Sequence, residues 1–310
     1  MTRFSIRFFA GLLGGALRAW PGGRSARGEV AQVMSRFRTL AALPLCVLLS
    51  ACGSGDTTPT TNTPATTTPG RITLHLAGDS TMGEGLPERR PETGWGEFLQ
   101  ELFNDERVVI SNYAKRGRST RTFLSEGFWA ALIANVKEGD YVIVQFGHND
   151  GSRDEQGTPP EEYRGNLARF VSEVRARKAL PVLATPIVVR SFNSDGSLRD
   201  THGPYPDIVR SVASGTSAPL LDMQVLSAQV VTEYGPEQSK ELFQHLAPGE
   251  HPNYPNGLAD NIHLSPGQHP NYPNGLADNI HLSPKGALVL AQRAAAGLKD
   301  MNSPLAAFLK

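Results

Sequence analysis

Between residues 71 and 300 the chain alternates short apolar runs with longer segments in which apolar residues recur every three or four positions. The runs predict buried strands, and the periodic segments predict helices that pack on them. Strands are expected at Ile72–Ala77, Val108–Tyr113, Tyr141–Phe146, Pro181–Val189 and Pro219–Met223. Helices are expected at Gly94–Phe103, Ser125–Lys137, Glu161–Ala179, Pro206–Ser214, Gln224–Tyr234 and Pro284–Lys299. This alternation is typical of an α/β domain with a central parallel sheet of about five strands.

Residues 34–52 have the layout of a secretory signal, with a short basic head, a short apolar stretch and small residues at the end. The last residues, Leu49-Ser50-Ala51-Cys52, are similar to the lipobox of bacterial lipoproteins, and this resemblance implies lipidation of Cys52. A plain secretory peptide with an incidental cysteine is the alternative. We therefore expect an exported protein, anchored to a membrane as a lipoprotein that faces the periplasm or the cell surface.

Two further segments precede the domain. Residues 1–33 are rich in Arg and Gly and come before a second possible start at Met34, so we interpret them as an over-extended start or part of a longer leader. Residues 53–70 are a Thr/Pro tract that cannot bury a core, which predicts an extended linker. The domain is expected over residues 71–300, followed by a C-terminal tail at 301–310.

Charge and cysteine content narrow the possible functions. The first 52 residues hold seven Arg, no Lys and one acid, which leaves 23 basic and 29 acidic residues in the remainder (30 − 7 and 30 − 1). This mildly acidic remainder argues against a nucleic-acid partner and against a polybasic membrane patch. Both cysteines, Cys46 and Cys52, lie in the signal, so the domain has neither a cysteine nucleophile nor a cysteine metal site.

Candidate chemistry follows the carboxyl ends of the predicted strands, where open parallel sheets bind their ligands. Ser80 follows the first strand in a Gly-Asp-Ser sequence, which by itself is also ordinary turn chemistry. Gly117 follows the second strand, Asn149 follows the third, and Asp278 and His281 come just before the last helix. The topology therefore brings four separate loops to one edge of the sheet.

These residue types suit acyl transfer by an activated serine. A serine attacks when a base takes its proton and a third group orients that base. Asp278 and His281 lie one turn apart, so the carboxylate can hold one imidazole nitrogen while the other faces Ser80. The oxyanion then needs preorganised donors, and the N–H groups of Ser80 and Gly117 and the side-chain amide of Asn149 are the candidates.

Together these blocks resemble the SGNH (GDSL-type) hydrolase family: Gly78-Asp79-Ser80, Gly117, Gly147-His148-Asn149-Asp150 and Asp278-x-x-His281. Their surroundings are similar to one branch, the rhamnogalacturonan acetylesterases of carbohydrate esterase family 12: Leu76-Ala77-Gly78-Asp79-Ser80-Thr81-Met82, Gly94-Trp95-Gly96, Gly117-Arg118-Ser119-x-Arg121-Thr122-Phe123 and His281-Leu282-Ser283-Pro284-x-Gly286-Ala287. The resemblance implies a three-layer α/β/α fold. It also implies that acetyl groups are removed from a polysaccharide by a Ser-His-Asp mechanism without a cofactor or metal ion.

Several nearby side chains have two interpretations each. His148 is a candidate for a substrate subsite or a structural role, and His202 either touches substrate or is an exposed loop residue. Trp95 offers either a sugar-stacking surface or core packing. Asp79 is expected to brace its loop by local hydrogen bonds.

One segment departs from the family pattern. His251–Pro266 is repeated without a change as His269–Pro284, so residues 251–284 hold a tandem duplication. The chain consequently carries two aspartate–histidine pairs, Asp260/His263 and Asp278/His281.

Only one pair can meet the serine. The second copy runs directly into a predicted helix, as in the family pattern, and we therefore assign Asp278 and His281 to the site. The first copy is then expected to form a surface bulge beside the mouth of the site. The opposite threading, with Asp260 and His263 in the site, is the alternative.

We therefore expect a carboxylic ester hydrolase that removes acetyl groups from a polysaccharide, with rhamnogalacturonan or pectin as the expected substrate. A lipase or acyl esterase of the same fold is one alternative, although such enzymes need a broad apolar channel and these loops are rich in Asn, Asp, Arg and Gly. A surface polysaccharide-binding protein that lost catalysis through the duplication is the other.

Overall fold

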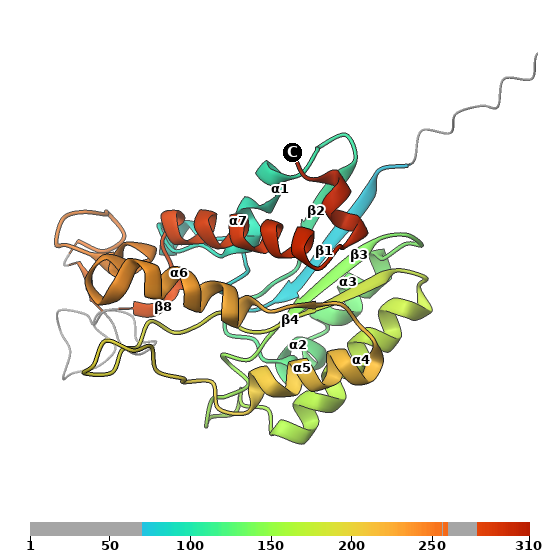
Figure 1. Cartoon of the computed structure of the whole chain (residues 1–310), viewed down its shortest axis with the longest axis horizontal. Helices are drawn as coiled ribbons and strands as arrows, with labels where there is room; N and C mark the ends of the chain where they lie inside the picture. Colours follow the sequence, from blue (N-terminus) through green and yellow to red (C-terminus); the bar gives the residue numbers. More distant parts are fainter. Residues whose placement is uncertain (1–69, 256, 260–277) are drawn as a thin grey trace, which may run out of the picture. The chain divides into compact units, whose positions relative to one another are not determined.

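The computed structural model describes residues 70–255, 257–259 and 278–310 (Figure 1). The expected leader, the signal peptide with Cys52 and the linker up to residue 69 lie outside these ranges, as do Asp260 and His263. Within the described ranges, none of the helices combines the length and the apolarity needed to cross a bilayer.

Five parallel strands form the central sheet, in the order β2-β1-β3-β4-β5. They are β1 (Ile72–Gly78), β2 (Val108–Asn112), β3 (Tyr141–Gln145), β4 (Leu180–Ala184) and β5 (Leu220–Leu221). β3 lies in the middle and is buried at every position, as its continuous apolar sequence predicts. The expected parallel sheet of about five strands is confirmed.

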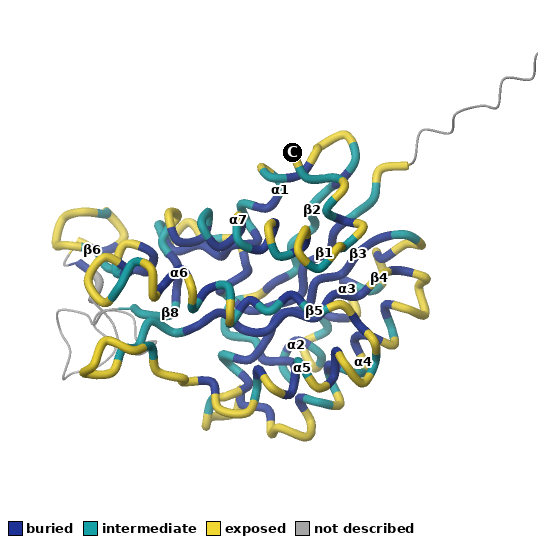
Figure 2. The backbone as a smooth tube through the Cα atoms, viewed as in Figure 1, coloured by how far each residue is buried: buried dark blue, intermediate teal, exposed yellow. Residues whose placement is uncertain are grey.

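Helices cover both faces of this sheet and give the three layers (Figure 1). Val142 and Val144 of β3 share a core with α2 (Thr120–Ser125), α3 (Phe128–Asn135), α4 (Pro160–Ala176) and α5 (Tyr205–Thr216). Tyr141 and Ile143 share the other core with α1 (Leu99–Leu102), α6 (Met223–Gln238) and α7 (Pro284–Asp300). Figure 2 shows the sheet as a buried layer between the two sets of helices. Alternate side chains of β3 therefore pack on opposite faces of the sheet, as the pleat requires.

Several element boundaries differ from the sequence prediction, and local backbone chemistry explains two of the differences. The helix expected at Ser125–Lys137 is the shorter α3, because Gly127 before it has a φ of +82°, outside the helical region, and separates it from α2. The strand expected at Pro181–Val189 ends at Ala184, shortly before Pro186, which has no N–H for a ladder. The helix expected at Gly94–Phe103 is a 3₁₀ turn, η2 (Trp95–Phe98), followed by the short α1.

A second, antiparallel sheet was not predicted from the sequence. Its order is β7-β6-β8, formed by β6 (Phe243–Leu246), β7 (Leu258–Ala259) and β8 (Asp278–Leu282). β8 also forms an isolated bridge to the loop after β1, where the backbone N–H of Thr93 donates to the carbonyl of Leu282 at 3.3 Å. This bridge positions the end of the chain beside the loop that follows β1.

α7 begins directly after β8 and packs tightly against the turn η3 (Ser239–Leu242). Ser283 caps the helix, its Oγ accepting a hydrogen bond from the backbone N–H of Gly286 at 3.1 Å. A Cβ at Gly286 would overlap the carbonyl group of Leu242, so only glycine allows this close approach.

Replacing Gly286 by alanine is expected to destabilise the protein by about 1–3 kcal/mol, because the added methyl forces the helix away from η3. The matched control is Gly165→Ala in α4, where a Cβ has no neighbour within 4 Å. That change should stabilise the protein by about 0.5–1 kcal/mol. Urea unfolding measures both values, and the same sign for the two variants would contradict the tight contact at Gly286.

Candidate active site

Ser80, His281 and Asp278 form a hydrogen-bonded chain beyond the end of β1. Ser80 Oγ lies 2.9 Å from Nε2 of His281, and Nδ1 of His281 lies 2.5 Å from Oδ2 of Asp278. The ionised carboxylate accepts, so Nδ1 carries the hydrogen and Nε2 offers its lone pair to the serine hydroxyl. This arrangement is the one that proton transfer from a serine requires.

The two ends of this chain come from distant parts of the sequence. Ser80 follows β1 and is partly buried, whereas His281 lies in β8, 201 residues later, and is only 1% exposed. The aspartate and the histidine lie in a strand, not in the single turn expected from the sequence. The neighbouring pairing of β8 with β6 fixes the direction from which the imidazole reaches the serine.

Asp278 is held in its ionised form. Burial alone would raise the pKa of Asp278. The neighbouring His281 ring and the hydrogen bonds that the Asp278 carboxylate accepts lower that pKa to about 2. Two of those bonds come from the backbone N–H groups of Ile280 and His281, at 2.9 and 2.8 Å from Oδ1. The carboxylate is therefore charged and oriented at neutral pH.

Four buried polar groups brace the turn that carries Ser80. Oδ1 of Asp79 accepts from the backbone N–H and the hydroxyl of Thr81, at 2.9 and 2.7 Å. The Thr81 hydroxyl accepts from Nε2 of Gln145 at 2.8 Å, and Gln145 Oε1 accepts from Nε1 of Trp95 at 2.8 Å. Because Trp95 is 0% exposed, its interpretation as a sugar-stacking residue is wrong. Its indole instead supports the serine turn from within the core.

The loops after β2 and β3 are tied together. Gly117 has a φ of +70°, in the left-handed region that favours glycine. The side-chain amide of Asn149 donates to the carbonyl of Arg118 at 3.2 Å. Oδ1 of the next residue, Asp150, accepts from the backbone N–H and the hydroxyl of Thr120, at 2.9 and 2.6 Å. The two loops that carry the candidate oxyanion donors therefore share one hydrogen-bond network.

His148 and His202 lie against each other. Nδ1 of His148 is 3.2 Å from Nε2 of His202, and the rings meet edge to face with centroids 4.6 Å apart. His202 is 8% exposed, so its interpretation as an exposed loop residue is wrong. Burial and the neighbouring His148 lower the pKa of His202 to about 3, so the imidazole is neutral.

Two charged residues that the sequence analysis missed contact the working nitrogen of His281. Nη1 of Arg116 lies 3.1 Å from Nε2, and Oε1 of Glu92 lies 3.7 Å from it. Arg116 and Glu92 also form an ion pair with each other. Burial and the charge of Arg89 lower the pKa of Arg116 to about 10, which leaves the guanidinium charged. The only sequence signal was the position of Arg116 directly before Gly117.

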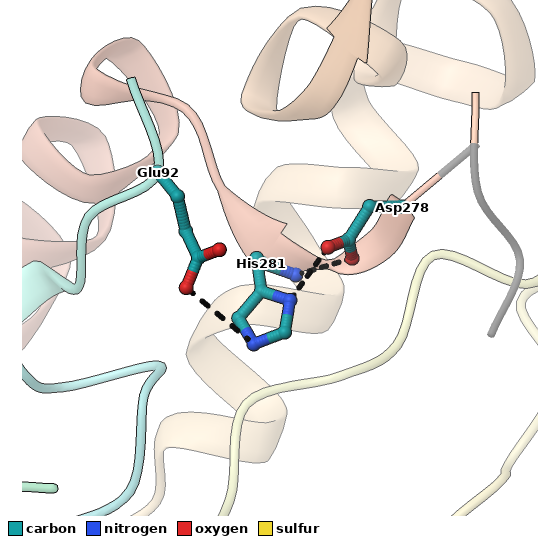
Figure 3. Close-up of side chains that lie close together, drawn as sticks. All are labelled: Glu92, Asp278 and His281. Carbon is teal, nitrogen blue, oxygen red and sulfur yellow. Dashed lines mark hydrogen bonds and ion pairs between the residues drawn. The ribbon is translucent and has the colours of Figure 1, made fainter. Parts of the chain in front are cut away.

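Among the described residues, one group has donor atoms close enough together to hold a metal ion, all within 4.8 Å of one another: Glu92, Asp278 and His281. Figure 3 shows that the two carboxylates face opposite ring nitrogens, Glu92 at Nε2 and Asp278 at Nδ1. An imidazole nitrogen binds a metal along its lone pair, so an ion at one nitrogen lies away from the carboxylate at the other. The geometry favours a hydrogen-bonded relay.

The structure describes residues 251–255 and 257–259 of the first repeat, and the rest of the expected surface bulge lies outside the described residues. Tyr254 is 7% exposed, and its hydroxyl donates to the carbonyl of Arg89 at 3.2 Å. The side-chain amide of Asn253 donates to the carbonyl of Pro87 at 2.8 Å. This part of the duplication therefore packs on the turn η1 (Pro87–Arg89), close to Glu92.

Comparisons with known proteins show similarity to a family of hydrolases. The model of the GDSL-like lipase/acylhydrolase family matches residues 76–289. Rhamnogalacturonan acetylesterase RhgT of Bacillus subtilis (strain 168) is 35% identical over 235 residues, which are 76% of this chain and 92% of that protein. The probable rhamnogalacturonan acetylesterase YesY of the same organism is 28% identical over 238 residues, 75% of this chain and 94% of that protein.

A solved structure shares the fold. The crystal structure of YxiM from Bacillus subtilis aligns with a TM-score of 0.60 at 23% identity, over 76% of this chain and 58% of that one.

Asp150→Asn is expected to change the pH dependence of stability. Burial raises the pKa of Asp150 to about 6, so the folded state prefers the protonated carboxyl. The wild type should therefore lose stability as the pH rises from about 4 to about 6, because the unfolded chain ionises first. Since the asparagine cannot ionise, the variant should gain about 2–3 kcal/mol relative to the wild type across this window.

Denaturant unfolding at several pH values measures the difference. The control is Asp154→Asn, which makes the same substitution at an exposed position of the same loop. A constant difference for Asp150→Asn would show that burial does not hold its proton.

Proposed function

The chain belongs to the GDSL-like lipase/acylhydrolase family, and we propose that it is a serine esterase that removes acetyl groups from a polysaccharide. One observation carries the proposal: Ser80 Oγ lies 2.9 Å from Nε2 of His281, while Asp278 holds the other ring nitrogen. Catalysis by this chain of groups needs no metal ion and no cofactor.

The reaction follows from the protonation states. Ser80 attacks the acetyl carbonyl while Nε2 of His281 takes the hydroxyl proton, and Asp278 balances the imidazolium that forms. The imidazolium then gives its proton to the sugar oxygen as the ester bond breaks, leaving an acetyl group on the serine. A water molecule attacks this acyl-enzyme by the same route and releases acetate, which restores the free hydroxyl of Ser80.

The negative oxygen of each tetrahedral intermediate needs donors that are already in place. We assign this role to the backbone N–H groups of Ser80 and Gly117 and to the side-chain amide of Asn149. The left-handed backbone at Gly117 and the hydrogen bond from Asn149 to the neighbouring loop support this assignment, because both hold the donors rigidly. His148 lies beside Asn149, and we place it next to the substrate subsite.

Rhamnogalacturonan is the first substrate to test. The names of RhgT and YesY support it, since both align over nearly their whole length. The charged residues that contact His281 fit a sugar better than an acyl chain, because a fatty acyl group needs an apolar channel. Acetate release from acetylated rhamnogalacturonan, xylan and peptidoglycan, compared at equal ester content, ranks the candidates.

We further propose that the enzyme is exported and anchored through a lipid on Cys52, with residues 53–70 as the tether. The lipobox-like end of the signal at residues 34–52 and the Thr/Pro composition of the tether support this location. An anchored esterase of this kind acts on polymers at the periplasm or the cell surface.

Ser80→Ala should lower kcat on a small acetyl ester by roughly 10³-fold or more, because the nucleophile is gone. Ser125→Ala is the matched control, since Ser125 is exposed at the end of α2 and should leave the rate close to wild type. Equal inactivity of wild type and Ser80→Ala would refute the esterase and leave the polysaccharide-binding alternative.

The duplication supplies its own control for the base. His281→Ala should lower kcat by roughly 10³-fold or more, because no group takes the serine proton. His263→Ala, the equivalent position of the first copy, should retain near wild-type activity. The two rates on the same ester decide the threading, and the reverse result would assign catalysis to Asp260 and His263.

A further inference from the structure

Arg116 and Glu92 surround the point where the reaction passes its proton to the sugar. Nη1 of Arg116 lies 3.1 Å from Nε2 of His281, and Glu92 faces the same nitrogen (Figure 3). The sugar oxygen that leaves must come within hydrogen-bonding distance of Nε2, about 3 Å. Groups on the carbons next to that oxygen therefore pass within reach of the guanidinium.

The pair is arranged with its cation toward the surface. The Glu92 side chain is 10% exposed and the Arg116 side chain 27% exposed. Both hydrogen bonds that the guanidinium donates to described residues use Nη1 alone. Glu92, the more buried partner, therefore binds one edge of the planar guanidinium. Another edge is available to a planar anion, which guanidinium groups bind in bidentate fashion.

The segment that carries Arg116 is strongly cationic in an otherwise mildly acidic domain. Residues 115–121 hold Lys115, Arg116, Arg118 and Arg121 and no acid. Arg118 and Arg121 are paired with Glu126 and Glu162, which leaves Arg116 as the member of this set that contacts the catalytic histidine. A cationic segment raises the local concentration of anions.

We propose that Arg116, held by Glu92, is the specificity-determining residue that binds a carboxylate on the sugar carrying or adjoining the acetylated hydroxyl. The inference rests on the proposed function and adds the group that selects acidic over neutral acetylated polysaccharides. Arg116 and the Ser80 hydroxyl both contact Nε2 of His281. A substrate carboxylate that takes the guanidinium leaves Nε2 to the serine, so an acidic substrate both binds and frees the base.

The test compares kcat and KM on three acetyl esters: a small neutral aryl acetate, an acetylated xylo-oligosaccharide and an acetylated oligogalacturonide. For Arg116→Gln the loss of kcat/KM on the oligogalacturonide should exceed the loss on either neutral ester by about tenfold or more, chiefly through KM. Arg116→Lys should recover only part of this difference, because it keeps the charge and loses the planar fork. Arg121→Gln, a paired arginine of the same segment, should match wild type on all three esters.

A second measurement needs no variant. Free galacturonate should inhibit hydrolysis of the aryl acetate competitively, more weakly at high salt, whereas galactose should not. Losses of Arg116→Gln that are equal on all three esters, or equal inhibition by galactose and galacturonate, would overturn the proposal. Inactivity of the wild type on the aryl acetate would instead refute the esterase itself, so the two failures are distinguishable.

Discussion

Everything at this site depends on the orientation of one imidazole. His281 works only if Asp278 fixes Nδ1 and Ser80 meets Nε2, and these contacts join segments 201 residues apart. The fold holds the ring through independent anchors on each side. The Thr93–Leu282 bridge ties β8 to the loop after β1, and the Ser283 cap starts α7, which is packed into place at Gly286. The last helix and the small sheet therefore set the position of the histidine together.

The architecture could be predicted because its signals are local. The apolar run of β3 and the alternation of runs and periodic segments are enough for a three-layer domain with a parallel sheet. The grouping of Ser80, Gly117 and Asn149 at one edge follows from topology, since each comes directly after a strand. The assignment of the second aspartate–histidine pair followed from the helix that continues it, and the structure brings that pair to Ser80.

What escaped prediction depends on contacts between loops. The sequence left Trp95 between sugar stacking and core packing. The structure buries it, with its indole bonded to Gln145, a partner that no local pattern encodes. Glu92 and Arg116 meet only because the loops after β1 and β2 converge, and neither belongs to a recognisable motif. β8 was taken for a turn because its short polar sequence lacks the alternation of a strand, and its pairing comes from β6. Contacts between side chains that are distant in the sequence determine these features, and the periodicity of the sequence does not reveal them.

The strand β6 has a partner strand on each side, and the two partners come from different copies of the repeat. Ala259 pairs with His245 and Asp278 pairs with Gln244, so the two strands stand roughly 9–10 Å apart across β6. Removing residues 260–277 would restore a single copy of the repeat by joining Ala259 to Asp278 through one peptide bond, which spans only about 3.8 Å between Cα atoms. A chain with a single copy of the repeat could therefore not place both Ala259 and Asp278 beside β6, and one edge of that strand would lack its partner. The duplication thus supplies the strand that covers an edge of β6, the kind of surface through which proteins otherwise aggregate.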